Sequence, residues 1–139
     1  MRTLAALLFV SVLAACQGGI DDLSPKATKP LPAKIVAKMK AKGMEKTSPI
    51  YFRLFKDEHV VEVWKQKVNG KFEMIQNYNI CAWSGTLGPK YKEGDRQAPE
   101  GFYTVTPAQM NPKSSYYLSF NIGYPNAFDR SHNRTGTHL

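Results

Sequence analysis

A segment dense in glycine and proline, residues 85–101, limits most strongly what this chain can fold into. Glycine and proline interrupt helices and strands, and the segment is too long and too polar for a hairpin turn. It therefore predicts a long loop, either a functional one or a surface loop whose charges are merely solvated. The expected corners of the loop are Gly88, Pro89, Gly94, Pro99 and Gly101. Its charged side chains are Lys90, Lys92, Asp95, Arg96 and Glu100.

The chain beyond residue 50 is rich in β-branched and aromatic residues, which is typical of strands. Strands are predicted at residues 50–55, 59–64, 72–75 running on to 78–83, 102–106 and 116–122. The pair Asn69-Gly70 predicts a type I′ hairpin turn, because both central residues of that turn need positive φ. The predicted fold class is mostly β, an antiparallel sheet or sandwich with long loops and a short N-terminal helix.

Residues 1–15 have the pattern of an export signal, with Arg2 before an apolar run that ends in small residues. The run is too short for a membrane-spanning helix of about 20 residues. Small residues directly before Cys16 resemble the lipobox of bacterial lipoproteins, which implies a signal peptide at 1–15 and lipidation of Cys16. The alternative is an ordinary cleaved signal in which Cys16 is incidental. The lipobox, followed by Gln17, predicts a lipid-anchored protein on the periplasmic face of the cell envelope, at the outer membrane.

Residues 16–49 are predicted to be a basic linker that contains a short helix. The chain carries a formal charge of +8, and much of the excess lies in this linker. Ile35, Val36 and Met39 have helical spacing, so an amphipathic helix is expected at 33–44, either at the domain edge or on a membrane surface. Export argues against nucleic acid as a partner. Anionic wall polymer or phospholipid headgroups suit the positive charge better.

The loop at residues 85–101 resembles the substrate-side loop of peptidoglycan L,D-transpeptidases, the YkuD-type domain and its YafK-like branch. The resemblance rests on a Gly-Asp pair, a spacer and Pro-Glu-Gly, followed by an aromatic segment. Candidates to meet the carboxylates of a peptide stem are Lys90, Lys92 and Arg96, and candidates to meet an amine are Asp95 and Glu100. For Glu100 the resemblance implies a structural hydrogen bond more than acid–base chemistry.

A second segment, residues 121–130, resembles the stretch that precedes the catalytic histidine in YafK-like proteins. The candidate substrate-binding residues here are Tyr124, Asn126, Asp129 and Arg130. The resemblance implies that they line the cleft, where Arg130 can bind a carboxylate through two parallel hydrogen bonds. The alternative is that Asn126 and Asp129 simply cap a turn. Both motifs occur in the family's order, and the resemblance extends over residues 50–139.

The family attacks its substrate with a cysteine thiolate from a His-Gly … Gly-Cys motif that lies downstream of these segments, and an amine or water resolves the thioester. Cys81 lies in a strand-like run without a glycine turn, so a buried, inert thiol is expected. His59 is expected at the surface, and His138 precedes the position of the catalytic histidine. No catalytic residue is therefore predicted. The histidines show no metal-ligand spacing, so no metal site is predicted, and a thiolate mechanism implies no cofactor.

Residues 50–139 are accordingly expected to be a truncated L,D-transpeptidase-like domain, an incomplete YkuD-like sheet or sandwich. The family implies action on peptidoglycan stem peptides, by cross-linking or by hydrolysis at diaminopimelate, with this chain inactive as given. The alternative is a non-catalytic, peptidoglycan-binding envelope lipoprotein. Expected partners are peptidoglycan and, through Cys16, the membrane.

Overall fold

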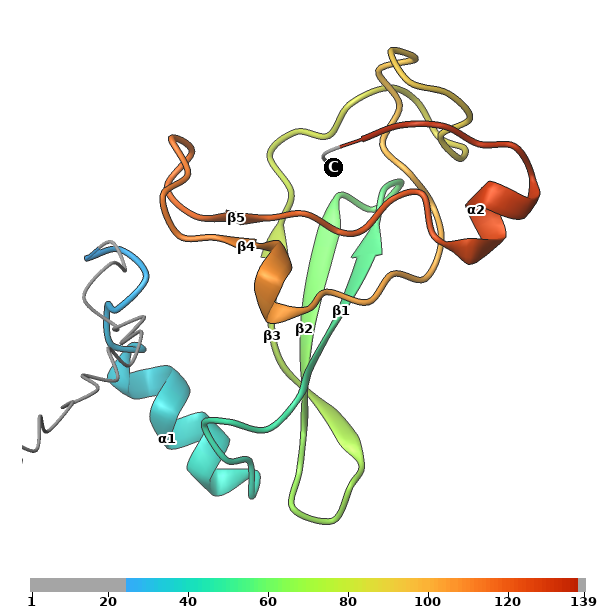
Figure 1. The fold of residues 1–139 in the computed structure, drawn as a ribbon. Helices are drawn as coiled ribbons and strands as arrows, with labels where there is room; N and C mark the ends of the chain where they lie inside the picture. Colours follow the sequence, from blue (N-terminus) through green and yellow to red (C-terminus); the bar gives the residue numbers. More distant parts are fainter. Residues whose placement is uncertain (1–24, 138–139) are drawn as a thin grey trace, which may run out of the picture.

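The computed structural model describes residues 25–137, and Figure 1 shows a three-stranded sheet with a helix at one end and long loops at the other. The elements of this first part are α1 (Ala33–Ala41), β1 (Ile50–Phe55), β2 (Val60–Gln66) and β3 (Phe72–Asn79). The strands are antiparallel in the order β1-β2-β3. The signal peptide and Cys16, both sequence predictions, lie outside the described residues.

The later part of the chain is mostly loop. A short 3₁₀ turn, Pro107–Gln109, leads into β4 (Met110–Asn111), which pairs antiparallel with β5 (Ser119–Phe120). Helix α2 (Ala127–Ser131) follows. The predicted mostly-β class, with antiparallel sheets, long loops and a short N-terminal helix, is confirmed.

A small hydrophobic core joins α1 to the sheet. Its buried members are Met39, Met44 and Ile75, with Ile35 and Val63 packed against them. A bulge in β3 brings Ile75 to this core: Val63 faces Gln76, whereas Trp64 faces Met74, so Ile75 is the extra residue between them. A bulge re-aims the side chain of the inserted residue, which here points toward α1.

The connection between β2 and β3 differs from the predicted type I′ turn. Gly70 has a φ of +80°, but Asn69 is not among the residues with positive φ. The N–H of Gly70 donates to the carbonyl of Lys67 at 2.9 Å, and the N–H of Lys67 donates to the carbonyl of Lys71 at 2.9 Å. The strands are therefore joined by a longer loop that closes on one left-handed glycine. The Asn-Gly pair marked the position of the turn correctly and its type wrongly.

The prediction that a strand continues through residues 78–83 is wrong beyond Asn79. Asn79 pairs with Val60, the first residue of β2, so the chain has no further partner on that strand. Cys81 consequently lies in a loop and is exposed, which corrects the expectation of a buried thiol.

The strands predicted at residues 102–106 and 116–122 are also corrected. In the first, the carbonyl of Phe102 accepts a hydrogen bond from the Asn126 side chain at 2.8 Å, so its partner is not a neighbouring strand. In the second, Tyr117 has a φ of +82°, which breaks the extended backbone and leaves only the two residues of β5.

Large apolar side chains are exposed over much of the described surface. Phe102 and Tyr116 are 86% and 89% exposed, and several side chains of β1 also face solvent. Among residues 25–137, no helix has the length and apolar character needed to cross a bilayer.

Candidate functional site

Asp95 organises the middle of loop 85–101 through four hydrogen bonds. Its carboxylate accepts from the Lys90 ammonium at 2.5 Å and from the backbone N–H groups of Tyr91, Lys92 and Gln97 at 2.9, 3.0 and 3.0 Å. Partial burial alone would raise the pKa of the Asp95 carboxyl, but these hydrogen bonds outweigh it and hold the pKa well below its usual range. Lys90 and Asp95, both predicted to meet substrate, are therefore paired with each other.

Lys56, in the turn between β1 and β2, ties both ends of the same loop to the sheet. Its ammonium donates to the carbonyl oxygens of Gly88 at 2.8 Å and Ala98 at 2.6 Å, and to the Glu100 carboxylate at 3.0 Å. Glu100 also accepts from the N–H of Gly88 at 2.8 Å, and its pKa is lowered, most of all by the hydrogen bond from Lys56. Sequence analysis missed Lys56, because no local signal in a turn reveals a partner more than 30 residues away.

The Gln97 side chain links the two sides of the loop. Its carbonyl oxygen accepts from the N–H of Thr86 at 3.0 Å, and its amide donates to the carbonyl oxygens of Gly88 at 2.8 Å and of Thr86. Gly85 is needed at the point of closest approach, since a Cβ there would lie 2.1 Å from the Gln97 carbonyl oxygen. Sequence analysis also missed Gln97, which carries no charge and belongs to no motif.

Asp129 is the centre of a second polar cluster and is only 1% exposed. Its carboxylate accepts from the Tyr103 hydroxyl at 3.0 Å, from the Arg134 guanidinium at 2.8 Å and from the N–H of Asn126 at 3.1 Å. The Asn126 side chain accepts from the N–H of Asp129 at 2.9 Å, so the two residues form a capping box at the start of α2. Burial raises the pKa of the Tyr103 hydroxyl, and the Asp129 carboxylate raises it further.

A hydrogen bond joins the two predicted substrate segments. The buried Tyr124 hydroxyl donates to the carbonyl oxygen of Lys90 at 3.0 Å, and the ring of Tyr124 lies 6.2 Å from that of Tyr103. The last described residues run beside the loop, where the N–H of Thr135 donates to the carbonyl oxygen of Tyr91 at 3.0 Å (Figure 1). The two segments therefore pack together as one unit.

A cavity of about 280 Å³ lies on this unit, within the loop itself. Its lining is Thr86, Leu87, Gly88, Pro89, Tyr91, Asp95 and Gln97. Leu87 and Tyr91 expose more than half of their surface and give the cavity apolar walls beside backbone and amide groups. Such a mixture suits a peptide-like ligand.

The candidate substrate-binding residues divide by how they are paired. Lys90, Asp95 and Asp129 form their hydrogen bonds with other groups of the chain. They therefore stabilise the shape of the surface. Arg130 is exposed at α2, and one of its guanidinium nitrogens donates to the Pro125 carbonyl oxygen. Because Arg130 is exposed, its other donors are open to a carboxylate, which arginine commonly binds in a bidentate manner.

Cys81 makes no hydrogen bond with a histidine anywhere in residues 25–137. His59 lies beside Trp83, with ring centroids 6.0 Å apart, and His132 contacts its own helix, α2. The same residues contain no group of three His, Cys, Asp or Glu side chains that could hold a metal ion.

No family model matches the chain. Two curated proteins, from Escherichia coli K12 and Escherichia coli O157:H7, both carry the name "Putative L,D-transpeptidase YafK". Each is 44% identical to this chain over 92 residues, which are 66% of this chain and 37% of the relative. The chain belongs to the L,D-transpeptidase family. Within that family it falls in the YafK-like branch, and it spans 37% of the length of the curated relatives it matches.

Proposed function

We propose that this chain is a cell-envelope protein whose loop 85–101 and segment 121–130 bind the stem peptides of peptidoglycan. The observation that carries the proposal is the hydrogen bond from Tyr124 to Lys90, which joins segment 121–130 to the loop that contains the cavity. In this arrangement Arg130 binds a stem carboxylate, while the cavity accepts the peptide backbone beside Tyr91.

The chemistry that the family name implies is acyl transfer at the diaminopimelate residue, through a thioester on a cysteine. We infer that the 139-residue chain by itself performs no such transfer. The His-Gly … Gly-Cys motif does not occur in its sequence, and within residues 25–137 no hydrogen bond joins Cys81 to a histidine. The exposed side chains of Phe102 and Tyr116 support the view that these residues are the substrate-side portion of a larger domain.

Binding and reaction can be tested in one sample. Soluble muropeptides titrated into isotope-labelled protein should shift the amide resonances of Thr86, Leu87 and Gln97 and leave the mass of the protein unchanged. Absence of shifts at all three residues would refute the cavity as the binding site. A mass increase that maps to Cys81 would refute the inference that the chain is inactive.

The second candidate function is a wall-binding lipoprotein that has no enzymatic role. The internal pairing of Lys90, Asp95 and Asp129 favours it, because a rigid binding surface needs no reactive group. Sequencing the genomic DNA that follows the Leu139 codon separates the two candidates. A segment encoding His-Gly and then Ser-x-Gly-Cys supports the enzyme, and a different sequence supports the binding protein.

Attachment to the envelope through Cys16 is part of the same proposal. Small residues before this cysteine support lipidation, and Gln17 after it supports sorting to the outer membrane. Cells that express the chain should incorporate labelled palmitate into it, and Cys16→Ser should abolish the incorporation. Equal labelling of the variant would show that Cys16 is incidental.

A further inference from the structure

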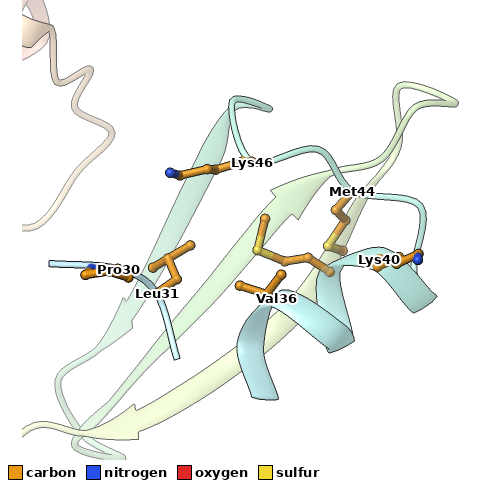
Figure 2. Close-up of a pocket in the computed structure, with 7 residues that line it drawn as sticks. Pro30, Leu31, Val36, Lys40, Met44 and Lys46 are labelled. Atoms are coloured by element: carbon orange, nitrogen blue, oxygen red, sulfur yellow. The ribbon is translucent and has the colours of Figure 1, made fainter. Parts of the chain in front are cut away.

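A groove beside α1 combines an apolar floor with basic ends. It measures about 330 Å³, and its lining includes Leu31, Val36, Met39, Met44, Lys40 and Lys46. Leu31 and Val36 are 45% and 48% exposed, although both are aliphatic. Figure 2 shows Lys40 and Lys46 on either side of the Met44 side chain. Apolar and cationic groups are thus presented together on one surface, called here the α1 surface.

The charge around the α1 surface is concentrated, and acids among residues 25–137 compensate little of it. Residues 26–46 contain seven lysines and one acid, Glu45, which gives this segment a formal charge of +6 out of +8 for the chain. Lys42 pairs with Glu73. Within residues 25–137, the six others make no ion pair: Lys26, which lies over the Tyr117 ring, and Lys29, Lys34, Lys38, Lys40 and Lys46.

We propose that the α1 surface docks on a bilayer that contains anionic phospholipid, with Leu31 and Val36 entering the headgroup region and the lysines contacting phosphates. A basic helix with exposed aliphatic side chains lies in the plane of such an interface. The charge complements anionic headgroups, and the apolar groove matches the acyl boundary beneath them. Peptidoglycan matches only the charge, because its glycan and peptide surface offers no apolar layer for Leu31, Val36 and the methionine floor.

The expected strength of docking follows from the composition of the surface. Two aliphatic side chains bury little area, so the lysines supply most of the attraction. Attraction of this kind is screened by salt, and docking should weaken steeply as ionic strength rises. The docking requires no acyl group on Cys16, so it goes beyond the proposed lipid anchor and is tested without it.

The test uses the full chain with Cys16→Ser and Cys81→Ser, so that no lipid can be attached. Its binding is measured by flotation with phosphatidylcholine vesicles, with and without about 30% phosphatidylglycerol. The apolar leader is present in every sample, so its contribution is common to all variants. Lys40→Gln with Lys46→Gln should reduce partitioning into anionic vesicles about 30-fold. The matched pair Lys92→Gln with Arg96→Gln removes the same charge from loop 85–101 and should change it less than 2-fold.

A fluorescent label reports the contact directly. An environment-sensitive dye on Val36→Cys should shift to shorter wavelength with anionic vesicles, whereas the same dye on Asp57→Cys, in the turn between β1 and β2, should not. Equal losses for the two charge pairs, or equal dye responses, would each overturn the proposal. Binding to sacculi that depends on Lys40 and Lys46, without binding to vesicles, would overturn it in favour of wall polymer as the partner.

Discussion

The hydroxyl of Tyr124 donates a hydrogen bond to the carbonyl oxygen of Lys90 across 3.0 Å and 34 residues of sequence. It connects the glycine- and proline-rich loop to the segment that leads into α2. Each segment has its own carboxylate at its centre, Asp95 in one and Asp129 in the other. The shape of the proposed binding surface therefore depends on how these two clusters are held together.

Removing the hydroxyl that joins the clusters should loosen the loop. Tyr124→Phe leaves the Lys90 carbonyl oxygen without its buried donor, at a cost of about 1–3 kcal/mol. Hydrogen exchange at the amides of residues 90–97 should become about 5-fold faster or more. Tyr78→Phe is the control, since Tyr78 is exposed and its hydroxyl has no hydrogen bond within the described chain. Equal exchange in both variants would show that this contact does not hold the loop.

Asp95 should matter more than any other acid of the loop. Asp95→Ala removes the acceptor of three backbone N–H groups and of the Lys90 ammonium, and hydrogen bonds to a charged group contribute about 1.5–3 kcal/mol. Exchange of the Tyr91, Lys92 and Gln97 amides should accelerate at least about 10-fold. Asp57→Ala, at an exposed position in a turn, should leave these rates unchanged.

Gly85 and Gly70 allow a comparison of backbone strain with steric contact. Both have positive φ, +87° and +80°, so alanine costs about 1 kcal/mol at either position. A Cβ at Gly85 also displaces Gln97 from its hydrogen bonds, whereas a Cβ at Gly70 meets nothing within 4 Å. Gly85→Ala should therefore be more costly, by about 1–2 kcal/mol, and should expose the Thr86 amide to exchange. An effect no larger than that of Gly70→Ala would contradict the role assigned to Gln97.

Lowering the pH should destabilise the clusters around Asp95 and Asp129 only when these carboxylates become protonated. Asp95 and Asp129 have an ordinary pKa of 3.8, and hydrogen bonds hold both folded-state pKa values below it. The unfolded chain then binds more protons, so their stabilisation is complete above about pH 5 and is lost as pH falls below about 4. Fluorescence of Trp83 and Trp64, followed from pH 7 downward, should be constant until this window. Asp95→Asn should reduce the change, and a transition well above this window would contradict the role given to these carboxylates.

Local pattern predicted the parts of this fold that local interactions determine. The strand predicted at residues 50–55 coincides with β1. The helix expected at 33–44 starts where α1 starts, and α1 ends three residues before the expected end. The segments at 102–106 and 116–122 have the composition of strands, but β-branched and aromatic residues form a strand only where a partner strand is available. Here the carbonyl of Phe102 accepts a hydrogen bond from the side chain of Asn126, the residue just before α2, instead.

The two segments of the candidate site stand out in the sequence, and their internal contacts do not. Loop 85–101 is marked by its glycines, prolines and charges, and segment 121–130 by its resemblance to the family. It did not reveal that Lys90 is turned inward to Asp95, or that Lys56 and Arg134 hold the segments from other elements. Those pairings join residues whose separation along the chain carries no periodic signal, so only the folded structure defines them.

The most direct test of the account is binding of the full chain to purified peptidoglycan sacculi, compared between Arg130→Gln and Lys71→Gln. Both variants remove one positive charge from an exposed side chain, and only Arg130 lies in the proposed site. Loss of a charge-assisted pair with a stem carboxylate should weaken binding about 10-fold in Arg130→Gln and leave Lys71→Gln near the parent value. Equal binding of both variants, or an equal loss in both, would contradict the claim that the two joined segments recognise the stem peptide.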